Sequence, residues 1–228
     1  MAEQWRSWRG AFEVISDIRW VNPPGAELLA ENKIRQLMRA REIGFKIPKT
    51  LVTNDPQAIR DFRIANLKTI VKAVSAPLLE HEDRDEFIFT TALEELSEGD
   101  DAAIRLCPLI VQERIQPKAD YRVTVIDDQL FAVRIQSIDG SAPTLDWRTQ
   151  KDGLSFQPFT LPADLHEKCI SLVRALGLAF GAIDLVEQNG EFFFLEINPN
   201  GEWGWLNKPP EMPIAEVMTD FLIRSDHV

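Results

Sequence analysis

Three oxygen-bearing side chains in the last third of the 228-residue chain have the types and spacing of metal ligands. Glu196 and Asn198 stand two residues apart in the run FFFLEINPN. Because successive residues of a strand point to opposite faces, both should lie on one face. Asp184 stands in the preceding predicted strand. Mg²⁺ is a hard cation that prefers carboxylates together with bound phosphate, so this pattern predicts a magnesium site.

The turn between these two strands decides whether the three side chains meet. A two-residue loop at 189–190 would place Asp184 opposite Leu195, on the wrong face. We predict a three-residue loop over 188–190, which places Asp184 opposite Glu196 and puts a glycine in the left-handed position of a bulged turn. The alternative, that the polar residues only face water on an exposed sheet, is disfavoured by the apolar residues around them.

Two lysines suit an anion in the same region. Lys72 interrupts an apolar strand at 69–74, where a buried charge needs a partner that an anion in a cleft would supply. A lysine at a strand edge can instead extend its ammonium group to water, so that alternative stays open. Lys33, near the start of a predicted helix, is less informative, because most lysines at such positions are ordinary surface residues.

A strand end near the middle of the chain offers groups that could recognise a base. Gln112, Glu113 and Ile115 end a β-branched run that starts at Leu109 and stops before Pro117. Backbone N–H and C=O groups left unpaired at a strand end can bind the edge of an adenine as a strand partner would.

Further charged residues follow this strand end, namely Asp120, Arg122, Arg134 and Arg148. Arg134 interrupts an apolar strand, and Arg148 stands in a predicted loop. Arginine suits phosphate because its planar guanidinium group donates two hydrogen bonds at once. For each arginine, an ordinary salt bridge is an equally good explanation.

Composition and missing motifs exclude several classes of function. The chain has 25 Lys and Arg residues against 36 Asp and Glu residues, and the formal charge of −11 argues against a nucleic-acid or membrane binder. No apolar run approaches the ~20 residues of a membrane helix. No GxxxxGK[ST], GxGxxG or histidine-based hydrolase pattern occurs. The distant Cys107 and Cys169 form neither a disulfide framework nor a metal motif, which predicts a cytoplasmic location.

The predicted elements give an α+β fold of two sheet-and-helix lobes. We expect lobes at 26–117 and 118–228, with 1–25 as the remnant of an upstream domain or a linker. In the first helix, Leu37 and Met38 should lie at the centre of the apolar face. The expected helices are 26–43, which Gly44 should end, one that opens at 54–56 with a cap residue before Pro56, 162–176 and 213–222. The expected strands are 69–74, 109–115, 121–126 and 130–138 as a hairpin around 127–128, 182–187 and 191–198. The expected loops are 80–101, with a short helix, and 139–161.

Taken in order, these residues resemble the motifs of ATP-grasp ligases. The matching segments are Asn32-Lys33, IVK at 70–72, VQERI at 111–115, Asp120-x-Arg122, Asp184 and LEINPN at 195–200. The chain is most similar to the branch that contains graspetide (microviridin-type) peptide ligases and ribosomal-protein glutamate ligases. The stretches 32–56 and 192–206 look most like the graspetide side, and the resemblance covers about residues 12–224.

The resemblance implies an ATP-grasp fold, with the nucleotide in a cleft between two α+β lobes. The family reaction activates a carboxylate as an acyl phosphate, from which an amine or a hydroxyl then displaces phosphate. The roles implied by the resemblance are Lys33 and Lys72 at the ATP phosphates, Gln112, Glu113 and Ile115 at adenine, Asp120 near the ribose, Asp184, Glu196 and Asn198 on Mg²⁺, and Arg134 and Arg148 at the transferred phosphoryl group, with Arg122 in the catalytic set.

We therefore predict an ATP- and Mg²⁺-dependent carboxylate–amine or carboxylate–hydroxyl ligase, with a peptide as a candidate substrate and a homodimer as a candidate assembly. A non-catalytic nucleotide-binding or regulatory module is the alternative, because the usual N-terminal domain and a glycine-rich phosphate flap have no visible counterpart. A third hypothesis is a peptide-docking surface at Trp147, Trp203 and Trp205, although packing in the core explains these residues better.

Overall fold

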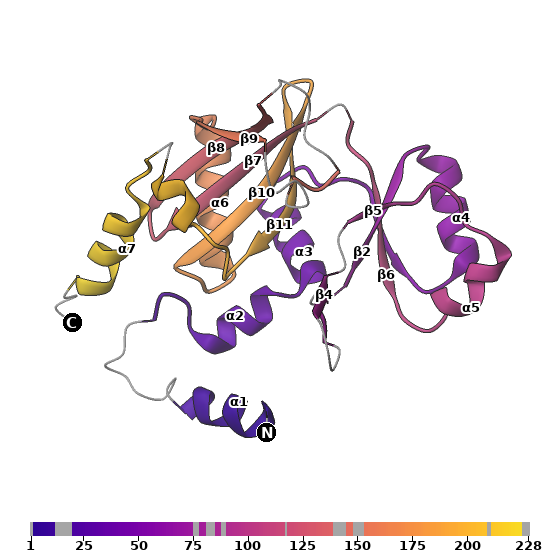
Figure 1. Ribbon diagram of the computed structural model, residues 1–228, viewed down its shortest axis with the longest axis horizontal. Helices are drawn as coiled ribbons and strands as arrows, with labels where there is room; N and C mark the ends of the chain where they lie inside the picture. The colour runs from indigo at the N-terminus through magenta and orange to yellow at the C-terminus, as the bar shows by residue number, and fades with distance from the viewer. Residues whose placement is uncertain are drawn as a thin grey trace.

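The structure, a computed structural model, has the predicted α+β class. It describes residues 2–11, 20–74, 78–80, 85–87, 90–116, 118–138, 145–147, 153–208 and 211–224. Its two main sheets are antiparallel throughout, and each has helices packed on it. The smaller sheet and its helices lie at one end of the molecule, and the larger sheet lies toward the other end (Figure 1).

The larger sheet has five strands in the order β11-β10-β7-β8-β9. They are β7 (Ala119–Ile126), β8 (Gln129–Ser137), β9 (Leu154–Pro158), β10 (Phe180–Gln188) and β11 (Glu191–Asn198). Helix α6 (Ala163–Ala175) buries Cys169 and Leu172 in one core with Val123 and Ile183 of the sheet. Burial raises the pKa of the Cys169 thiol to about 12, so this cysteine is a core residue with little thiolate.

The smaller sheet has the order β1-β6-β2-β5 and is covered by two helices. Its elements are β1 (Thr50–Thr53), β2 (Thr69–Ala73), β5 (Thr91–Ala92), β6 (Leu109–Glu113), α4 (Pro56–Ala65) and α5 (Asp101–Ile104), while β3 (Leu78–Glu80) and β4 (Asp85–Phe87) pair separately. Ile59, Ile104 and Val111 form the core between sheet and helices. As the sequence predicts, Asp55 caps α4 by accepting from the Gln57 N–H at 3.0 Å.

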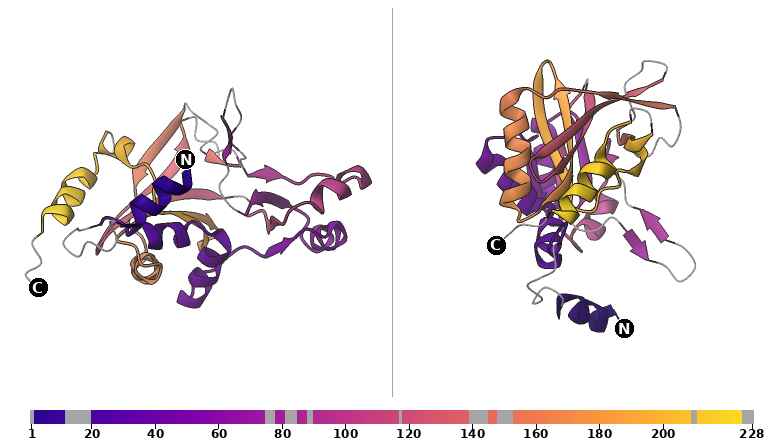
Figure 2. Two further views of the ribbon diagram at one scale, coloured as in Figure 1. Left: turned by 90° about the horizontal axis from the view of Figure 1, so that it is seen from below. Right: turned by 90° about the vertical axis from the view of Figure 1, so that its left-hand side faces the viewer.

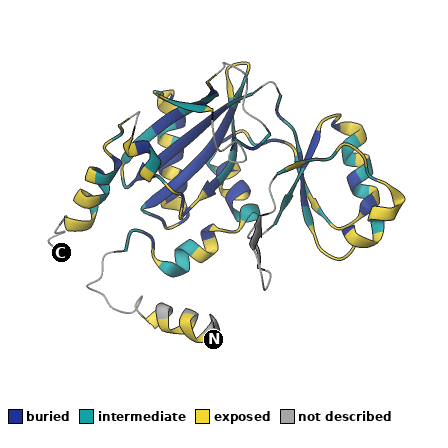
Figure 3. Ribbon diagram, viewed as in Figure 1, coloured by how far each residue is buried: buried dark blue, intermediate teal, exposed yellow. Residues whose placement is uncertain are grey.

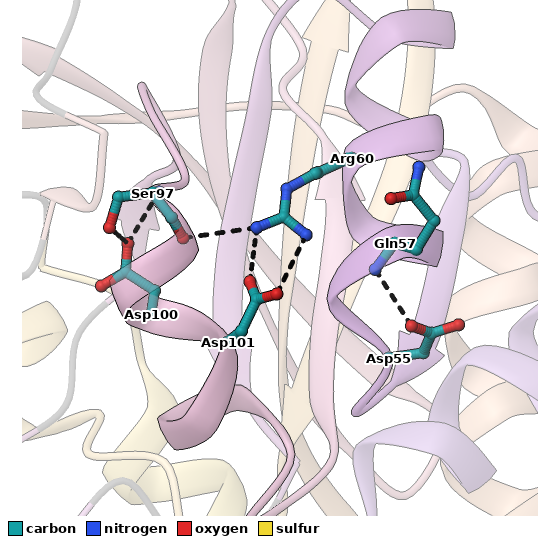
Figure 4. A network of polar contacts seen from close by, with 6 residues as sticks. All are labelled: Asp55, Gln57, Arg60, Ser97, Asp100 and Asp101. Atoms are coloured by element: carbon teal, nitrogen blue, oxygen red, sulfur yellow. Dashed lines mark hydrogen bonds and ion pairs between the residues drawn. The ribbon is translucent and has the colours of Figure 1, made fainter.

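A polar network ties α4 to the segment before β6 (Figure 4). Arg60 donates to both carboxylate oxygens of Asp101 and, at 3.3 Å, to the carbonyl oxygen of Ser97. Ser97 and Asp100 form a reciprocal capping box at the start of the 3-10 helix η2 (Glu98–Asp100). The hydrogen bond to Asp101 raises the pKa of Arg60, and hydrogen bonds from Ser97 lower the pKa of Asp100.

The predicted helix at 26–43 is in fact two helices, α2 (Pro24–Ala30) and α3 (Lys33–Ile43). Asn32 interrupts them with an extended backbone, and its side chain accepts from the Arg35 N–H at 2.9 Å. As the N-cap, Asn32 supplies the hydrogen-bond acceptor that a backbone N–H in the first turn of α3 lacks. The apolar periodicity continues across this boundary, so it did not reveal that one helix ends and another begins. Gly44 ends α3 with φ of +96°, as predicted.

The buried face of α3 also differs from the predicted stripe. Leu37 is buried as expected, but Met38 is 54% exposed, and the polar Gln36 is buried instead. The Gln36 side chain donates to the carbonyl oxygen of Ile197 at 2.8 Å and accepts from its N–H at 3.1 Å, as a neighbouring strand would. Gln36 thus fixes α3 against the outer edge of β11.

The packing of residues 24–45 follows the larger sheet, although the predicted lobe at 26–117 groups them with the smaller one. Ala30, Leu37 and Phe45 belong to the hydrophobic core beneath the larger sheet. The reason is the contact of α3 with β11, which joins segments about 160 residues apart in sequence. The predicted boundary near residue 117 stays a prediction.

Asn22 joins the segment before α2 to the larger sheet, which the interpretation of 1–25 as a remnant or linker did not anticipate. It is 8% exposed and donates to the carbonyl oxygens of Phe180 and Pro199, at 3.0 and 2.8 Å. Its own carbonyl oxygen accepts from the N–H groups of Ala179 and Phe180, both at 3.0 Å. All the hydrogen-bonding positions of the buried amide are thereby used.

The turn between β10 and β11 is a two-residue loop, so the predicted three-residue loop is wrong. Gln188 pairs with Glu191, and the intervening Asn189 and Gly190 have φ values of +53° and +81°. Two consecutive residues with positive φ match the right-handed twist of a hairpin, and Asn-Gly is the sequence that favours this turn.

Asp184 nevertheless pairs with Glu196, as predicted, because the register changes farther along the hairpin. Leu185 pairs with Phe194, and the shift between Asp184 and Leu185 leaves Leu195 as a bulge. A single extra residue reverses which side chains share a face. The β-bulge therefore lies at the site, and not at the turn.

The predicted loop at 139–161 is shorter than expected, because residues 154–158 form β9. This strand pairs with β8 from Ser137 opposite Leu154 to Val133 opposite Pro158. It lies at the sheet edge, where a proline is tolerated. The predicted hairpin of β7 and β8 is confirmed, with Asp127 at φ of +56° in its turn.

Two helices lie at the ends of the described chain (Figures 1 and 2). Helix α1 (Ala2–Ala11) lies beyond α2, and helix α7 (Ile214–Ile223) lies at the end of the larger sheet away from the smaller one. Trp5 and Trp8 of α1 are 63% and 59% exposed and meet edge to face. Exposed residues otherwise gather on the outer sides of the helices (Figure 3). No helix among the described residues combines the length and apolarity needed to cross a bilayer.

Candidate functional site

A cleft of about 600 Å³, including the open solvent at its mouth, lies where the two main sheets meet. Side chains of β2, β6, β7, β10 and β11 line it, together with the described segment 145–147. Seven of the sequence-predicted residues are among its lining, namely Lys72, Gln112, Glu113, Ile115, Asp120, Asp184 and Glu196.

The predicted metal ligands share the face of the larger sheet that is turned away from α6. Asp184 lies directly opposite Glu196, while the flanking Ile183 and Ile197 belong to the core on the other face. Asn198 follows Glu196 by two residues and pairs opposite Ala182, so it continues the same face. The β-bulge thus produces the arrangement that the sequence predicted, by a different route.

Three carboxylates in this region, those of Asp184, Glu196 and Asp120, are each paired with a cation. Arg122 donates to Asp184 at 2.9 Å, with side chains only 6% and 4% exposed. Lys33, the first residue of α3, lies 3.2 Å from Glu196, with side chains 22% and 14% exposed. A third pair joins Lys118 to Asp120. Lys33 and Arg122 are thus held beside the cleft by ion pairs with two of the predicted metal ligands, a pairing that the sequence did not predict.

Asp120 lies at the start of β7 and is 3% exposed. Burial raises the pKa of its carboxyl group above the ordinary 3.8, with smaller contributions in the same direction from Asp184 and Asp146, and Lys118 acts in the opposite direction. Its Oδ2 atom has no hydrogen-bond partner among the described residues. A buried acceptor of this kind can receive a hydrogen bond from a ligand hydroxyl.

The smaller sheet contributes the opposite wall. Ile70 and Lys72 alternate with residues that pack on α4, so both side chains lie on the cleft face of β2. Gln112 is 1% exposed, donates to Thr50 at 2.9 Å, and keeps an Oε1 atom with no partner in the described part of the chain.

The backbone ladder of the smaller sheet ends where an adenine edge was predicted to bind. The N–H groups of Glu113 and Arg114 donate to the carbonyl oxygens of Lys49 and Lys68, both at 2.9 Å. Ile115 comes next and is 7% exposed, beside the cleft. No backbone hydrogen bond of Ile115 occurs among the residues described. The N–H of Glu113 is therefore already used, and recognition of an adenine edge at Ile115 stays a prediction.

Arg134 does not reach the cleft, so its predicted place beside the phosphates is corrected. It pairs opposite Tyr121, while Arg122 pairs opposite Val133. Arg134 therefore lies on the α6 face, and its charge lowers the pKa of Tyr121 against the larger raising effect of burial. The two-residue turn at 127–128 determines which residues of β7 and β8 lie on the same face. The length of this turn was the feature of the sequence that could have placed Arg134 correctly. Arg148 lies outside the described residues.

The sequence analysis missed Lys118 and considered Trp147 only as part of a docking surface, although both line the cleft. Lys118 follows Pro117 and forms an ion pair with Asp120, two residues later in the chain. None of the motifs considered in the sequence includes this lysine. Trp147 lines the cleft and also packs on Phe156 and Trp205, with ring centroids 6.2 and 6.1 Å apart. The predicted tryptophan surface is thus at least partly a core cluster, and docking of a peptide there stays a prediction.

Gly201 was also missed as a packing residue. A Cβ atom at this position would overlap Ala182 and the Nη2 atom of Arg122. The loop after β11 can therefore lie on the Arg122–Asp184 pair only because residue 201 has no side chain. The signal was present in the run NPNG, which begins at the predicted ligand Asn198.

The side chains at the metal-ligand positions fit Mg²⁺. Among the described residues, no three His, Cys, Asp or Glu side chains gather as a complete cage. Mg²⁺ does not require one, because it commonly binds one or two carboxylates together with substrate phosphates and water. Asp184 and Glu196 supply the two carboxylates. Asn198 is exposed, and although its Oδ1 accepts from the Asn200 N–H at 2.8 Å, an amide oxygen retains a second lone pair.

Comparison with known proteins identifies the family of the chain. Residues 27–222 match the RimK-like ATP-grasp domain family. The chain is 25% identical over 213 residues to the tetrahydromethanopterin:alpha-L-glutamate ligase of Methanocaldococcus jannaschii. That alignment covers 90% of this chain and 70% of the relative.

Solved structures of peptide-modifying enzymes have the same fold. The macrocyclase MdnC of Microcystis aeruginosa, bound with the precursor peptide MdnA, is 29% identical with a TM-score of 0.81, over 98% of this chain and 70% of that one. A RiPP-associated ATP-grasp ligase of Chryseobacterium gregarium, in complex with ADP and a leader and core peptide, is 28% identical with a TM-score of 0.84. The second match covers 97% of this chain and 68% of the other.

Proposed function

We propose that this chain, which belongs to the RimK-like ATP-grasp family of ATP-dependent ligases, joins a carboxylate to an amine or hydroxyl through an acyl phosphate. A carboxylate oxygen attacks the γ-phosphorus of ATP, and ADP leaves. The amine or hydroxyl then attacks the acyl carbon, phosphate leaves, and the nucleophile loses its proton to solvent. Neither step needs a side-chain nucleophile, because positioning and charge neutralisation supply most of the catalysis of phosphoryl transfer.

One observation carries this proposal: two carboxylates on one face of the larger sheet lie in the same cleft as a lysine from the smaller sheet. Asp184 and Glu196 are opposite each other, and Lys72 lines the facing wall. Such a cleft suits a ligand that carries both phosphate and a divalent ion. On this proposal, Lys72 and Lys33 neutralise the phosphates.

The same geometry suggests places for the rest of the nucleotide. Ile115, just past the end of the β6 ladder, would face the adenine edge with Glu113 and Gln112 beside it. The unpartnered Oδ2 atom of the buried Asp120 would accept a hydrogen bond from a ribose hydroxyl. Arg122 acts through Asp184, and we assign it a positioning role, since its guanidinium group contacts that carboxylate and not the open cleft.

We further propose that Asp184, Glu196 and Asn198 hold Mg²⁺. When bound, the ion would supply positive charge to the phosphate oxygens. The residues themselves supply oxygen donors of the kind that Mg²⁺ prefers, on adjacent strands of a rigid sheet.

The substrate class that we propose is a peptide. Two relatives of known structure were solved with a precursor peptide or with leader and core peptides, and both match nearly the whole of this chain. We also propose that the protein works in the cytoplasm, where its two free cysteines would stay reduced. A homodimer stays a prediction, which is based on the exposed Trp5 and Trp8.

Calorimetry and product analysis test this function. The protein should bind a non-hydrolysable ATP analogue more tightly with Mg²⁺ than without it, and should release ADP only when a carboxylate- and amine-bearing acceptor peptide is present. Failure to bind any adenine nucleotide would refute the proposal. Tight ATP binding without turnover, across peptide and amino-acid acceptors, would favour the alternative of a non-catalytic nucleotide-binding module.

A further inference from the structure

Lys33 and Glu196 are bound to each other, although the proposed function assigns one to phosphate and the other to the metal. The Nζ atom lies 3.2 Å from Oε2. A carboxylate that is already neutralised by an ammonium group attracts a divalent cation less strongly, because the cation is repelled by the lysine as it approaches. The ion pair and the metal site therefore compete for the same carboxylate.

The position of Lys33 in α3 is unfavourable for the helix itself. Lys33 is the first helical residue, and no acidic residue stands in that first turn. The N-terminal end of a helix carries partial positive charge, so a lysine there is repelled by the helix dipole. Glu196 compensates this repulsion in the structure. Its position therefore does not serve the stability of the helix, and the contact that it makes is with a cleft residue, Glu196.

Gln36 fixes the distance between the two elements. One turn along α3 from Lys33, its amide bonds both backbone groups of Ile197, the neighbour of Glu196. The first turn of α3 is thereby held at the edge of β11. Lys33 can reach Glu196 without any movement of the helix, and only its flexible side chain has to rotate for it to leave.

The three charge pairs of the cleft differ in how easily they can separate. Arg122 and Asp184 are 6% and 4% exposed, and the loop at Gly201 lies against the guanidinium group. Lys118 and Asp120 are 10% and 5% exposed. Lys33 is 22% exposed, at the edge of the site. The Lys33–Glu196 pair is therefore the one that can change partners.

We propose that Lys33 is an exchangeable counter-ion of Glu196. It holds Glu196 until a nucleotide supplies phosphate, then transfers to the phosphate and so releases Glu196 to the divalent cation. This inference rests on the proposed function. Its consequence is a coupling between the two ligands: nucleotide raises the affinity for the divalent ion, and by linkage the ion raises the affinity for nucleotide by the same factor.

Manganese binding without nucleotide tests the exchange directly. Mn²⁺ is a paramagnetic substitute for Mg²⁺, and its bound fraction can be measured by electron paramagnetic resonance on the full chain. The variant Lys33→Met should bind Mn²⁺ about fivefold more tightly than the parent protein, because one positive charge has been removed from beside the ligand. Adding Glu196→Gln to that variant should abolish the gain.

Lys46→Met is the matched control. Lys46 also pairs with a glutamate of β11, Glu191, but at the other end of the strand and outside the cleft. Its Mn²⁺ affinity should equal that of the parent protein. Thermal unfolding of each variant establishes that the fold is intact, and Lys33→Gln provides a second neutral variant if the methionine protein does not fold.

The coupling factor provides the second measurement. ADP should raise Mn²⁺ affinity in the parent protein, and this factor should fall several-fold in Lys33→Met. An unchanged or weaker Mn²⁺ affinity of Lys33→Met without nucleotide, or no detectable binding, would overturn the exchange. If no protein binds ADP, the proposed function fails, whereas the measurement without nucleotide still decides whether Lys33 shields Glu196.

Discussion

Two arginine–aspartate pairs, one in each half of the molecule, use the same chemistry for different ends. Arg60 and Asp101, which join α4 to α5, are 26% and 30% exposed. Arg122 and Asp184, of which Asp184 lines the cleft, are 6% and 4% exposed. The energetic consequences of separating the partners differ, because water can replace a lost partner at the surface but not in the interior.

The pairs differ also in how completely they are satisfied. The Arg60 network closes on itself through Ser97 and its capping box (Figure 4). In the cleft, Arg122 Nε and Asp120 Oδ2 have no hydrogen-bond partner among the described residues. A closed network holds two elements together, whereas buried polar atoms with unused capacity are what a ligand site requires.

The largest expected effect comes from breaking the buried pair. Arg122→Met removes the buried cation that pairs with the Asp184 carboxylate and should lower the free energy of unfolding by about 3–5 kcal/mol. Urea denaturation monitored by tryptophan fluorescence measures this loss. Arg60→Met is the control and should produce a clearly smaller loss; equal losses in the two variants would remove the distinction between the pairs.

The second effect concerns activity and not stability. Glu196→Gln keeps the shape of the side chain but removes the charge proposed to hold Mg²⁺, and should lower the rate of ADP release by about 100-fold or more. Glu191→Gln changes the same residue type on the same strand, outside the cleft, and should leave the rate unchanged. Comparable rates for the two variants, both folded, would contradict the metal role.

The third effect tests how closely the loop after β11 packs on the buried pair. Gly201→Ala forces a Cβ against Ala182 and the Arg122 guanidinium group, and should lower the free energy of unfolding by about 1–3 kcal/mol. Gly204→Ala, at the first residue of the 3-10 helix η4 (Gly204–Asn207) that follows this loop, is the control, because a Cβ there meets nothing within 4 Å. If thermal unfolding shifts equally for both, the close approach to Arg122 is not a constraint.

The smallest effect is a change in pH dependence. Because burial raises the pKa of Asp120, the folded protein retains this proton above pH 3.8, where the unfolded chain has lost it. The group therefore makes the protein less stable as the pH rises from about 3.8 through the folded-state pKa. Asp120→Asn should remove that decline from a series of denaturation curves, and an unaltered pH profile would show that Asp120 does not titrate in this window.

The sequence was reliable where a short segment determines its own structure. Gly44 and the Asp55 cap end and begin helices as predicted, because each satisfies backbone groups only a few residues away. Alternation along β11 correctly placed Glu196 and Asn198 on one face. The division of the chain into sheet-and-helix segments was predicted for the same reason.

The prediction failed where a distant segment decides the outcome. Met38 is exposed and Gln36 buried, because the edge of β11, about 160 residues away, offers two backbone groups to an amide. Arg134 is a different case: it lies on the α6 face because the nearby turn at 127–128 sets its pairing with β7, and the alternation within its own strand does not show this. A hydrophobicity pattern contains neither piece of information.

By itself, the sequence determined which side chains could form the site: carboxylates on neighbouring strands, a lysine within an apolar strand, and a strand end beside them. Only the tertiary structure decided how they are combined. The bulge at Leu195 sets Asp184 opposite Glu196, and α3 brings Lys33 to the same carboxylate. The physical reason is that side-chain types and their alternation are local properties, whereas the register of strands and the partner of a charge depend on contacts between residues far apart in the chain.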